Sequence, residues 1–326
     1  MEILKRLAVA ALAIAATHGA AAAQDWTPRR PVNVVVHTGP GAGSDAFARA
    51  FVNVIEKEKL TTARFVVQNR TGGGSINAIN YIAAQNDDDT TLGVYASNWT
   101  TDYLVQKDAQ TSLQALTPIA NLIFEPALIV VRPDSRFKTL KDFIDTAKAN
   151  PNQLKQAGGS PLGRDAMLRH IMVAFTGAQW PLVSFPGGGE RLAAVMGGHV
   201  DTLVLDGSEV GDFISSGKLR ALAQVSDVRV PTFPADVPTI KEAGYDIALP
   251  LQPRGVVAPP KMSPAAADFY RKLLARMIET PTWQKYVEET RVQTSFIAAG
   301  DLSKFFDQTT ERTRNALKSA NIEVAR

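Results

Sequence analysis

The stretch VNVVVHTGPGAGSDAFARAFVNVIEK, from Val32 to Lys57, joins a valine-rich run to a glycine-rich turn and then to a helical pattern. Runs of β-branched residues are typical of buried strands, and after the turn the apolar residues recur at helical spacing. Such a turn brings the backbone and the unpaired N–H groups of a helix start to one place, which favours a negatively charged group. The stretch therefore predicts a strand–turn–helix unit and raises the question of what its turn binds.

Strand-like and helix-like segments alternate along the chain. RFVVQN, GGGSINAINYIAAQN and TLGVYAS come next, a second series runs from ALIVV to LAAVMGGHVDTLVLD, and LRALAQV is one more expected strand. This alternation implies parallel strands with right-handed crossovers. One further strand and then three long helical patterns follow. The expected fold class is α/β, with two lobes that each hold a mostly parallel sheet flanked by helices.

The elements after the second series are too few for a third domain, so we expect them to return to the first sheet. The first lobe then holds residues 24–122 and 250–326, and the second lobe holds 123–249. The chain would cross between the lobes near 121–125 and near 247–254. Two lobes joined by two crossing segments form a hinged clamshell that closes around a ligand.

The first residues have the pattern of a secretory signal. Lys5 and Arg6 precede a short apolar run, and Ala21 and Ala23 place the expected cleavage before Gln24, so that residues 1–23 are removed. The apolar run is too short to span a bilayer, which takes about 20 residues. We therefore expect an exported, soluble mature protein, with an uncleaved anchor as the alternative.

Composition excludes several classes of function. The chain has no cysteine, which rules out thiol catalysis and cysteine-ligated metals. Its 35 basic and 32 acidic residues give a formal net charge of +3, and no basic stripe with interleaved aromatic residues is present. The sequence therefore gives no case for nucleic-acid binding.

Four loops at expected strand ends carry small polar residues, and in open α/β sheets ligands bind at such ends. They are residues 37–45, 69–75, 96–99 and 158–165. In the first loop, Gly39-Pro40-Gly41-Ala42-Gly43-Ser44 fails the G-x-G-x-x-G pattern, and no Lys-Ser or Lys-Thr follows it. A nucleotide loop is therefore disfavoured. A structural turn with Ser44 or Asp45 as the helix cap remains the alternative to a site for another anion.

The sequence does not assemble a reaction centre. GGSPLG is similar to a nucleophile elbow, but the second position after Ser160 is Leu162 rather than glycine. His170 lies within a helical pattern, His199 lies in a turn, and His37 at a strand end is expected to line a site rather than to act as a base. Without an HExxH motif or a carboxylate–histidine cluster, we expect no metal and no cofactor.

A set of motifs in order along the chain resembles one family, the extracytoplasmic solute receptors of tripartite tricarboxylate transporters, also called Bug-type receptors. The motifs cover nearly the whole mature chain and are PGAGSDAFAR, VVQNRTGGGS, VVRPDSRFKTLKDFIDTAKANP, GGSPLG, FPGGGERLAAVMGGHVD and GKLRALAQVSDVRVPTFPADVPTIKEAGYD. The resemblance implies a two-lobed, type II-like periplasmic binding protein without enzymatic activity. It would close on a small carboxylate and deliver it to a separate integral-membrane permease.

The resemblance also implies which residues hold the ligand's carboxylate, partly through ordered water. The motif falls on Thr38, Gly41, Ala42, Gly43, Ser44 and Asp45 in the first lobe, and on Gly159, Ser160 and Gly163 in the second. The family's usual residues are replaced by Pro161, Arg164, Met167, Phe185-Pro186 and Pro253. These departures leave the particular ligand open.

Side chains at other expected strand ends suggest further contacts. Arg164, at a helix start, would pair with a second carboxylate or form a solvated surface charge. Trp99, after Ser97 and Asn98, would stack on an aromatic ring or pack in the core. Together these two contacts would indicate an aromatic dicarboxylate.

Two more strand ends complete the expected site. Asp206 would accept a ligand hydrogen bond, hold a water or cap the next helix, and Phe185 would add apolar wall. The leading hypothesis is a monomeric periplasmic receptor of a transporter. A secreted α/β hydrolase and a sensory receptor of the same fold are the alternatives.

Overall fold

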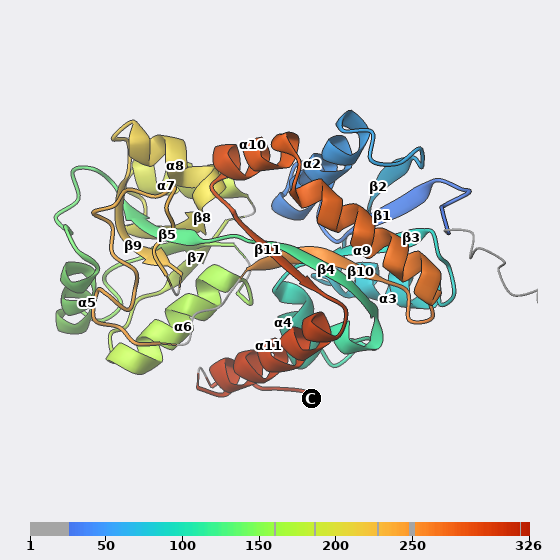
Figure 1. Cartoon of the computed structure of the whole chain (residues 1–326). Helices are drawn as coiled ribbons and strands as arrows, with labels where there is room; N and C mark the ends of the chain where they lie inside the picture. Colours follow the sequence, from blue (N-terminus) through green and yellow to red (C-terminus); the bar gives the residue numbers. More distant parts are fainter. Residues whose placement is uncertain (1–25, 160, 186, 227, 248–251, 320) are drawn as a thin grey trace, which may run out of the picture.

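The computed structural model describes residues 26–159, 161–185, 187–226, 228–247, 252–319 and 321–326 (Figure 1). Its strands form two sheets. The six-stranded sheet has the order β11 (Gln293–Ala298), β4 (Thr117–Phe124), β10 (Pro253–Ala258), β3 (Thr91–Tyr95), β1 (Val32–Val36) and β2 (Phe65–Asn69). The five-stranded sheet has the order β7 (Leu182–Ser184), β6 (Gln156–Gly158), β8 (Thr202–Asp206), β5 (Ala127–Val131) and β9 (Arg220–Val225).

Helices cover both sheets. The helices associated with the first sheet are α2 (Gly43–Lys57), α3 (Ile76–Ala84), α4 (Asn98–Val105), α9 (Pro264–Ile278), α10 (Pro281–Thr290) and α11 (Ala299–Ser319), with a short 3-10 turn, η2 (Leu113–Ala115). Those associated with the second sheet are α5 (Leu140–Ala149), α6 (Arg164–Thr176), α7 (Gly188–Met196) and α8 (Gly207–Ser215). The two-lobed α/β fold expected from the sequence is confirmed.

Both sheets are mixed rather than mostly parallel. In the first sheet β1 pairs in parallel with β2 and β3, whereas β10 and β11 run antiparallel to their neighbours. In the second sheet β5 runs antiparallel to β8 and β9. Of these antiparallel strands, β5 directly follows the first crossing and β10 the second, whereas β11 follows α10.

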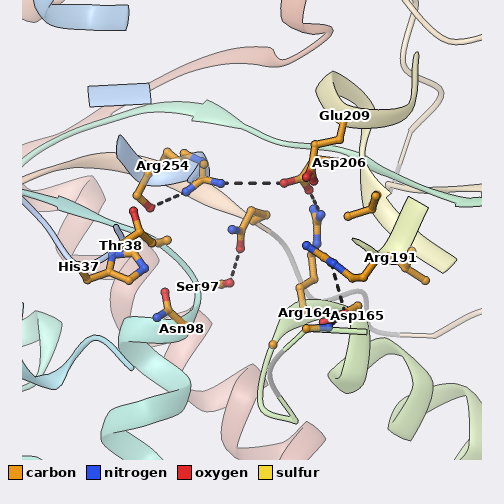
Figure 2. A pocket seen from close by; sticks show the side chains of 18 residues that line it. His37, Thr38, Ser97, Asn98, Arg164, Asp165, Arg191, Asp206, Glu209 and Arg254 are labelled. Atoms are coloured by element: carbon orange, nitrogen blue, oxygen red, sulfur yellow. Dashed lines mark hydrogen bonds and ion pairs between the residues drawn. The ribbon is translucent and has the colours of Figure 1, made fainter. Parts of the chain in front are cut away.

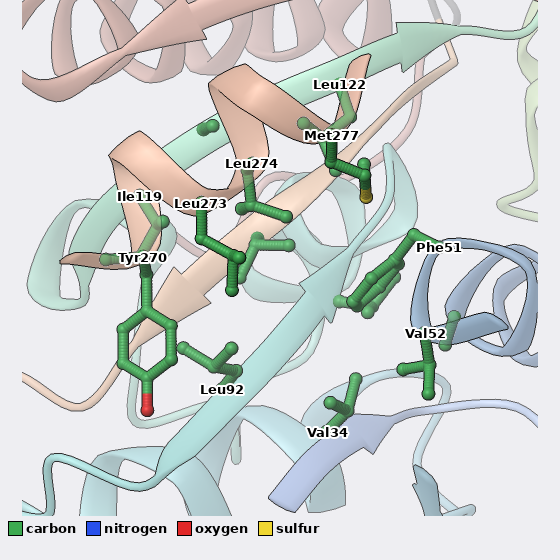
Figure 3. Close-up of a cluster of buried hydrophobic side chains, with 14 of the residues drawn as sticks. Val34, Phe51, Val52, Leu92, Ile119, Leu122, Tyr270, Leu273, Leu274 and Met277 are labelled. Carbon is green, nitrogen blue, oxygen red and sulfur yellow. The ribbon is translucent and has the colours of Figure 1, made fainter. Parts of the chain in front are cut away.

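The opening stretch folds as expected because its two halves bury complementary surfaces. Val34 of β1 and Phe51 and Val52 of α2 meet in one apolar cluster. On the same face α9 contributes Tyr270 and Met277 (Figure 3). A second cluster on the opposite face packs α3, α4 and α11 against the sheet. Each buried aliphatic side chain contributes roughly 1.5–3 kcal/mol, so this double-sided burial holds the first lobe without disulfides.

The two crossings lie side by side. The first is the short link between β4 and β5, and the second leads from β9 to β10. The backbone N–H of Glu125 donates to the Gln252 carbonyl at 2.9 Å, so the crossings are hydrogen-bonded to each other. The expected crossing near 247–254 lies partly outside the described residues. The exact lobe boundaries stay a prediction.

The C-terminal helices touch both lobes. Helix α10 contacts α2 and α8, and α11 contacts β4, α4 and α6 (Figure 1). Leu104 of α4, Met167 of α6 and Leu317 of α11 form a small apolar cluster between the lobes. Strand β11 was not expected from the sequence and pairs with β4 at the edge of the first sheet.

Candidate functional site

A cavity of about 310 Å³ lies between the two lobes, where β1, β3, β6 and β8 end (Figure 2). Cavities of this size are common for small-molecule ligands. Its described lining consists of His37, Thr38, Gly43, Ser44, Ala96, Ser97, Asn98, Gly159, Gly163, Arg164, Asp165, Arg191, Val204, Leu205, Asp206, Glu209, Gln252 and Arg254. Both lobes therefore contribute polar and charged groups to one space.

The first-lobe turn is held in place by Asp45, which lies under it. The Asp45 carboxylate accepts hydrogen bonds from the Gly41 backbone N–H at 2.8 Å, from Asn69 Nδ2 at 2.9 Å and from Arg49 Nε at 2.9 Å. Burial alone raises the pKa of Asp45, but these hydrogen bonds outweigh it and the pKa is lowered. Neither Ser44 nor Asp45 caps α2, whose N-cap Ala42 gives no side-chain hydrogen bond. The first backbone N–H groups of α2 are thus left for another acceptor.

The second-lobe turn repeats this arrangement. The Gly159 backbone N–H donates to Asp165 Oδ2 at 2.7 Å, and the N-cap of α6, Gly163, gives no side-chain hydrogen bond. Arg191 Nη1 lies 3.7 Å from Asp165 Oδ2. Ser160 lies outside the described residues. Two uncapped helix starts, one from each lobe, therefore border the same cavity, which is a favourable setting for an anion.

Arg254 connects the lobes from the start of β10. Its side chain is almost fully buried, Nε donates to Glu125 Oε2 at 2.8 Å, and Nη1 donates to Ser44 Oγ at 2.7 Å. Nη2 lies 3.9 Å from Asp206 Oδ2 in the second lobe. A Cβ at Gly43 would lie 2.6 Å from Nη2, so glycine at this position lets the guanidinium lie close to the turn.

Arg164 and Asp206 form an ion pair across the second-lobe side of the cavity (Figure 2). Arg164 Nη1 also donates to the Glu125 carbonyl at 2.7 Å. Desolvation lowers the pKa of Arg164 to about 10, which leaves it cationic at neutral pH. Asp206 is the N-cap residue of α8, but its side chain makes no capping hydrogen bond. The capping alternative for Asp206 is therefore not seen, because its carboxylate pairs with arginine instead.

His37 and Trp99 do not offer reactive or stacking groups to the cavity. Trp99 is fully buried in the first-lobe core, and its Nε1 donates to His37 Nδ1 at 2.9 Å. Burial and the charge of Arg254 lower the pKa of His37 to about 3. A hydrogen bond to the Val94 carbonyl raises this pKa, but by less than the other two effects lower it. His37 is consequently neutral with both ring nitrogens engaged. The ring of Trp99 takes the core role that the sequence left as the alternative to stacking.

Three further polar groups line the first-lobe wall. Ser97 Oγ donates to Gln252 Oε1, and Asn98 Nδ2 donates to Asp102 Oδ2 at 3.3 Å. Thr38 Oγ1 is buried and has no hydrogen-bond partner in the part of the chain that the structure describes. A buried hydroxyl without a partner is costly, so a ligand or water is the expected partner of Thr38.

Ten of the residues expected from the sequence line the cavity: His37, Thr38, Gly43, Ser44, Ser97, Asn98, Gly159, Gly163, Arg164 and Asp206. Gly41 and Ala42 line an adjoining cavity of about 670 Å³ instead. Asp45 and Trp99 are buried, and Phe185 packs against the second-lobe core. Contact of any of these residues with a ligand stays a prediction.

The sequence reasoning missed Asp165, Arg191, Glu209, Gln252 and Arg254, which also line the cavity. Arg254 had one signal, a charged residue within the apolar strand run PRGVVA. Within the described residues, no helix is long and apolar enough to cross a membrane. No group of three histidine, aspartate or glutamate side chains in those same residues is arranged for a metal ion.

Comparison with known proteins places these features in a family. Residues 48–322 match the tripartite tricarboxylate transporter family receptor. Protein BugT of Bordetella pertussis is 30% identical over 250 residues, which cover 75% of this chain and 76% of the relative.

Solved structures share the fold. An R. palustris protein solved with adipate has a TM-score of 0.81 at 21% identity, covering 91% of this chain and 99% of that one. MatC from Rhodopseudomonas palustris, solved with bound malate, has a TM-score of 0.75 at 22% identity, covering 89% and 100% of the two chains.

Proposed function

This chain belongs to the tripartite tricarboxylate transporter receptor family, and from that premise we propose that it captures a small organic carboxylate between its lobes. It would do so in the periplasm, as a monomer, and deliver the ligand to the integral-membrane subunits of a tripartite transporter. The observation that carries the proposal is the convergence of two uncapped helix starts, those of α2 and α6, on one cavity.

The chemistry of the cavity supports an anionic ligand group. Backbone N–H groups at helix starts favour carboxylates, and the Thr38 hydroxyl, which has no partner among the described residues, adds a donor beside them. Arg164 is the side chain best placed to strengthen this grip if Asp206 shifts on ligand binding. The related proteins solved with adipate and malate bind dicarboxylates, which agrees with a carboxylate class. Trp99 lends no support to an aromatic ligand, because its ring is in the core.

Closure would follow from binding because the ligand contacts both lobes only when they are together. Such differential affinity shifts the population toward the closed state. Arg254 already joins the first-lobe turn, the first crossing and the second-lobe strand end, so it would hold the closed geometry.

We also propose that the protein transforms no ligand. His37, the histidine in the cavity lining, is neutral and has both nitrogens engaged, so it is unsuited as a general base. The comparisons give no support to the hydrolase alternative, because the matched family is one of solute receptors. A sensory receptor of the same fold would use the same cleft, and the neighbouring genes would distinguish the two.

Native mass spectrometry of the freshly purified protein tests the proposal, because it weighs any co-purified ligand. We expect one small carboxylate bound per chain and released unchanged on denaturation. The Arg164→Ala variant should weaken binding by at least about tenfold, with Arg49→Ala as the exposed control. Turnover of the released compound, or a ligand without an acidic group, would contradict the proposal.

A further inference from the structure

Two groups of contacts join the lobes outside the cavity, one on each side of the crossing strands. On one side, Leu104, Met167 and Leu317 form the apolar cluster between α4, α6 and α11. On the other side, α10 of the first lobe contacts α8 of the second (Figure 1). This second contact includes an arginine that directly follows α10.

That arginine, Arg291, has a backbone conformation that is unusual for its residue type. It is the C-cap residue of α10, and its φ of 57° and ψ of 28° lie in the left-handed region. Glycine or asparagine is the common residue at such a helix end, because a Cβ is unfavourable in this conformation. Backbone strain of this kind persists where the surrounding structure over-determines it. An arginine in this conformation therefore points to a role for its side chain.

The Arg291 side chain lies against α8 of the second lobe. Its Nη1 and Nη2 are 3.3 Å and 3.2 Å from Asp212 Oδ1. A Cβ at Gly211 would lie 2.5 Å from Cζ and 2.8 Å from Nε of Arg291, so the guanidinium occupies the place where another residue would carry its side chain. The Arg291 side chain is 21% exposed and that of Asp212 is 92% exposed. Packing against Gly211 is therefore the larger part of this contact, since exposed ion pairs contribute little.

Gly211 is also unusual in its own helix. It is buried inside α8, where glycine lowers helix stability relative to alanine. The contact thus joins two residues that are each unfavourable locally, an arginine at a left-handed helix end and a glycine in a helix interior. Both choices have the same explanation, because each is needed for the guanidinium to rest on the α8 backbone.

The contact lies beside the cavities without being part of them. Thr290, which precedes Arg291, lines the cavity of about 670 Å³ together with Ser208 and Glu209 of α8. Arg291 and Gly211 are not among the described lining of either cavity. A change at Arg291 or Gly211 therefore alters how the lobes are held without removing a group that lines the cavities.

We propose that Arg291 and Gly211 form a latch that favours the closed arrangement of the two lobes even when no ligand is bound. The contact exists only while α10 and α8 are together, so its free energy stabilises the closed state alone. Opening the lobes exposes the guanidinium and leaves the space above Gly211 unfilled. The latch thereby sets the fraction of closed protein before binding, and this holds whatever the chemistry of the ligand.

Distances between two labels on the ligand-free protein test the latch. The chain has no cysteine, so Lys57→Cys on α2 and Lys141→Cys on α5 place one spin label on an exposed site of each lobe. Refolding from denaturant removes any co-purified ligand, and pulsed electron paramagnetic resonance then gives the populations of closed and open lobes. We expect a measurable closed population in the labelled parent. Arg291→Gly should lower the closed-to-open ratio by about threefold or more. A parent without closed molecules, or an unchanged ratio in the variant, would overturn the latch.

Arg291→Gly also separates a latch from a role in folding. Glycine is suited to a φ of 57°, so the variant should stay folded in a thermal melt while its lobes open more. Arg291→Asn, which tolerates the same backbone conformation, serves if the glycine variant does not fold. Lys285→Ala, a change at a 71% exposed side chain of α10, is the control and should keep the parent ratio. An equal shift in the control would count against a specific latch.

Gly211→Ala tests the contact from the other lobe. Alanine favours the helix, but its methyl group displaces the guanidinium, so this variant should lower the closed-to-open ratio as Arg291→Gly does. Added to Arg291→Gly, it should change the ratio by less than about twofold, because the guanidinium is already absent. Equal effects of Gly211→Ala in the two backgrounds would show that these residues do not act as one latch.

Discussion

The two glycine turns that face each other across the cleft share one hydrogen-bond arrangement. They differ in how many further contacts hold that arrangement in place. In each turn an aspartate at the helix start accepts a backbone N–H of the turn: Gly41 to Asp45 at 2.8 Å, and Gly159 to Asp165 at 2.7 Å. Asp45 is 1% exposed and takes two further donors. Asp165 instead has an arginine at 3.7 Å that lines the cavity.

Because of this difference, the two lobes would have different roles in ligand binding. The first-lobe turn is fixed by Asp45, whose arginine partner, Arg49, is 54% exposed and does not line the cavity. The second-lobe turn is surrounded by charges that form the variable part of the site, namely Arg164, Arg191 and Asp206. Affinity for a carboxylate would come from both turns, whereas discrimination among carboxylates would come mainly from the second lobe.

Arg254 joins the first-lobe turn to the first crossing and lies near the second-lobe strand end, so its replacement should have the largest effect. Arg254→Met leaves the buried Glu125 carboxylate without its ion pair, and we expect a loss of about 3–5 kcal/mol in the free energy of unfolding. Urea denaturation at neutral pH measures it. The double variant Arg254→Met with Glu125→Met should recover at least half of the loss. A single-variant loss below about 1 kcal/mol would show that the lobes do not rely on this pair.

Removing the aspartate charge from each turn tests whether the first-lobe turn is held more firmly than the second-lobe turn. Asp45→Asn breaks up a carboxylate with three donors and should cost about 2–4 kcal/mol in the free energy of unfolding. Asp165→Asn should cost about 1 kcal/mol or less, because its arginine is distant. The same denaturation experiment compares them. If Asp165→Asn proved the more costly, the first-lobe turn would not be the firmer one.

The first-lobe wall also predicts a pH dependence of stability through His37. The unfolded chain protonates this histidine below about pH 6.5, whereas the folded protein does so only near pH 3, so stability falls as the pH falls. Between pH 6.5 and 5 the loss should be about 2 kcal/mol. His37→Gln should lack that loss, and wild-type and variant curves that stay parallel would contradict it.

His170 in the second lobe provides the control for this experiment. Burial also lowers the pKa of His170, but its side chain is only partly buried, so its contribution to the pH dependence should be smaller. His170→Gln should therefore change the slope of stability against pH less than His37→Gln does.

Adding a methyl group to each turn should give the smallest effect. Gly43→Ala places a Cβ against the guanidinium of Arg254 and should cost about 1 kcal/mol, since the end of this side chain can shift. Gly159→Ala meets its nearest atom at 3.9 Å and should change stability by less than about 0.5 kcal/mol. Thermal melts of the two variants measure the difference. An equal or reversed order would indicate that Arg254 does not lie against the first turn.

Periodicity predicted most of the fold because most elements bury one regular face. Strand β1 and helix α2 follow from the valine run and the helical spacing of Phe47, Phe51 and Val54. Strand β11 was not predicted because it is an edge strand with no fully buried residue. The alternation of apolar and polar residues along it is therefore weak. The direction of each strand also lies beyond local pattern, since it depends on which sheet the chain re-enters.

The site was only half predictable for a related reason. Residues beside the glycine turns, such as Thr38 and Gly163, could be placed from their position at strand ends. Arg254 lies 210 residues after its partner Ser44, and only the return of the second crossing brings them together. For Trp99 the sequence left stacking and core packing open, and the structure shows core packing because the turn of α4 directs its ring into the core.

A crystal structure of the protein with its co-purified ligand is the most direct test of the central claim, that two helix starts hold one carboxylate without converting it. The account predicts carboxylate oxygens about 3 Å from backbone N–H groups at the starts of both α2 and α6, with the compound intact. A ligand bound away from these two helix starts, or found as a reaction product, would contradict it.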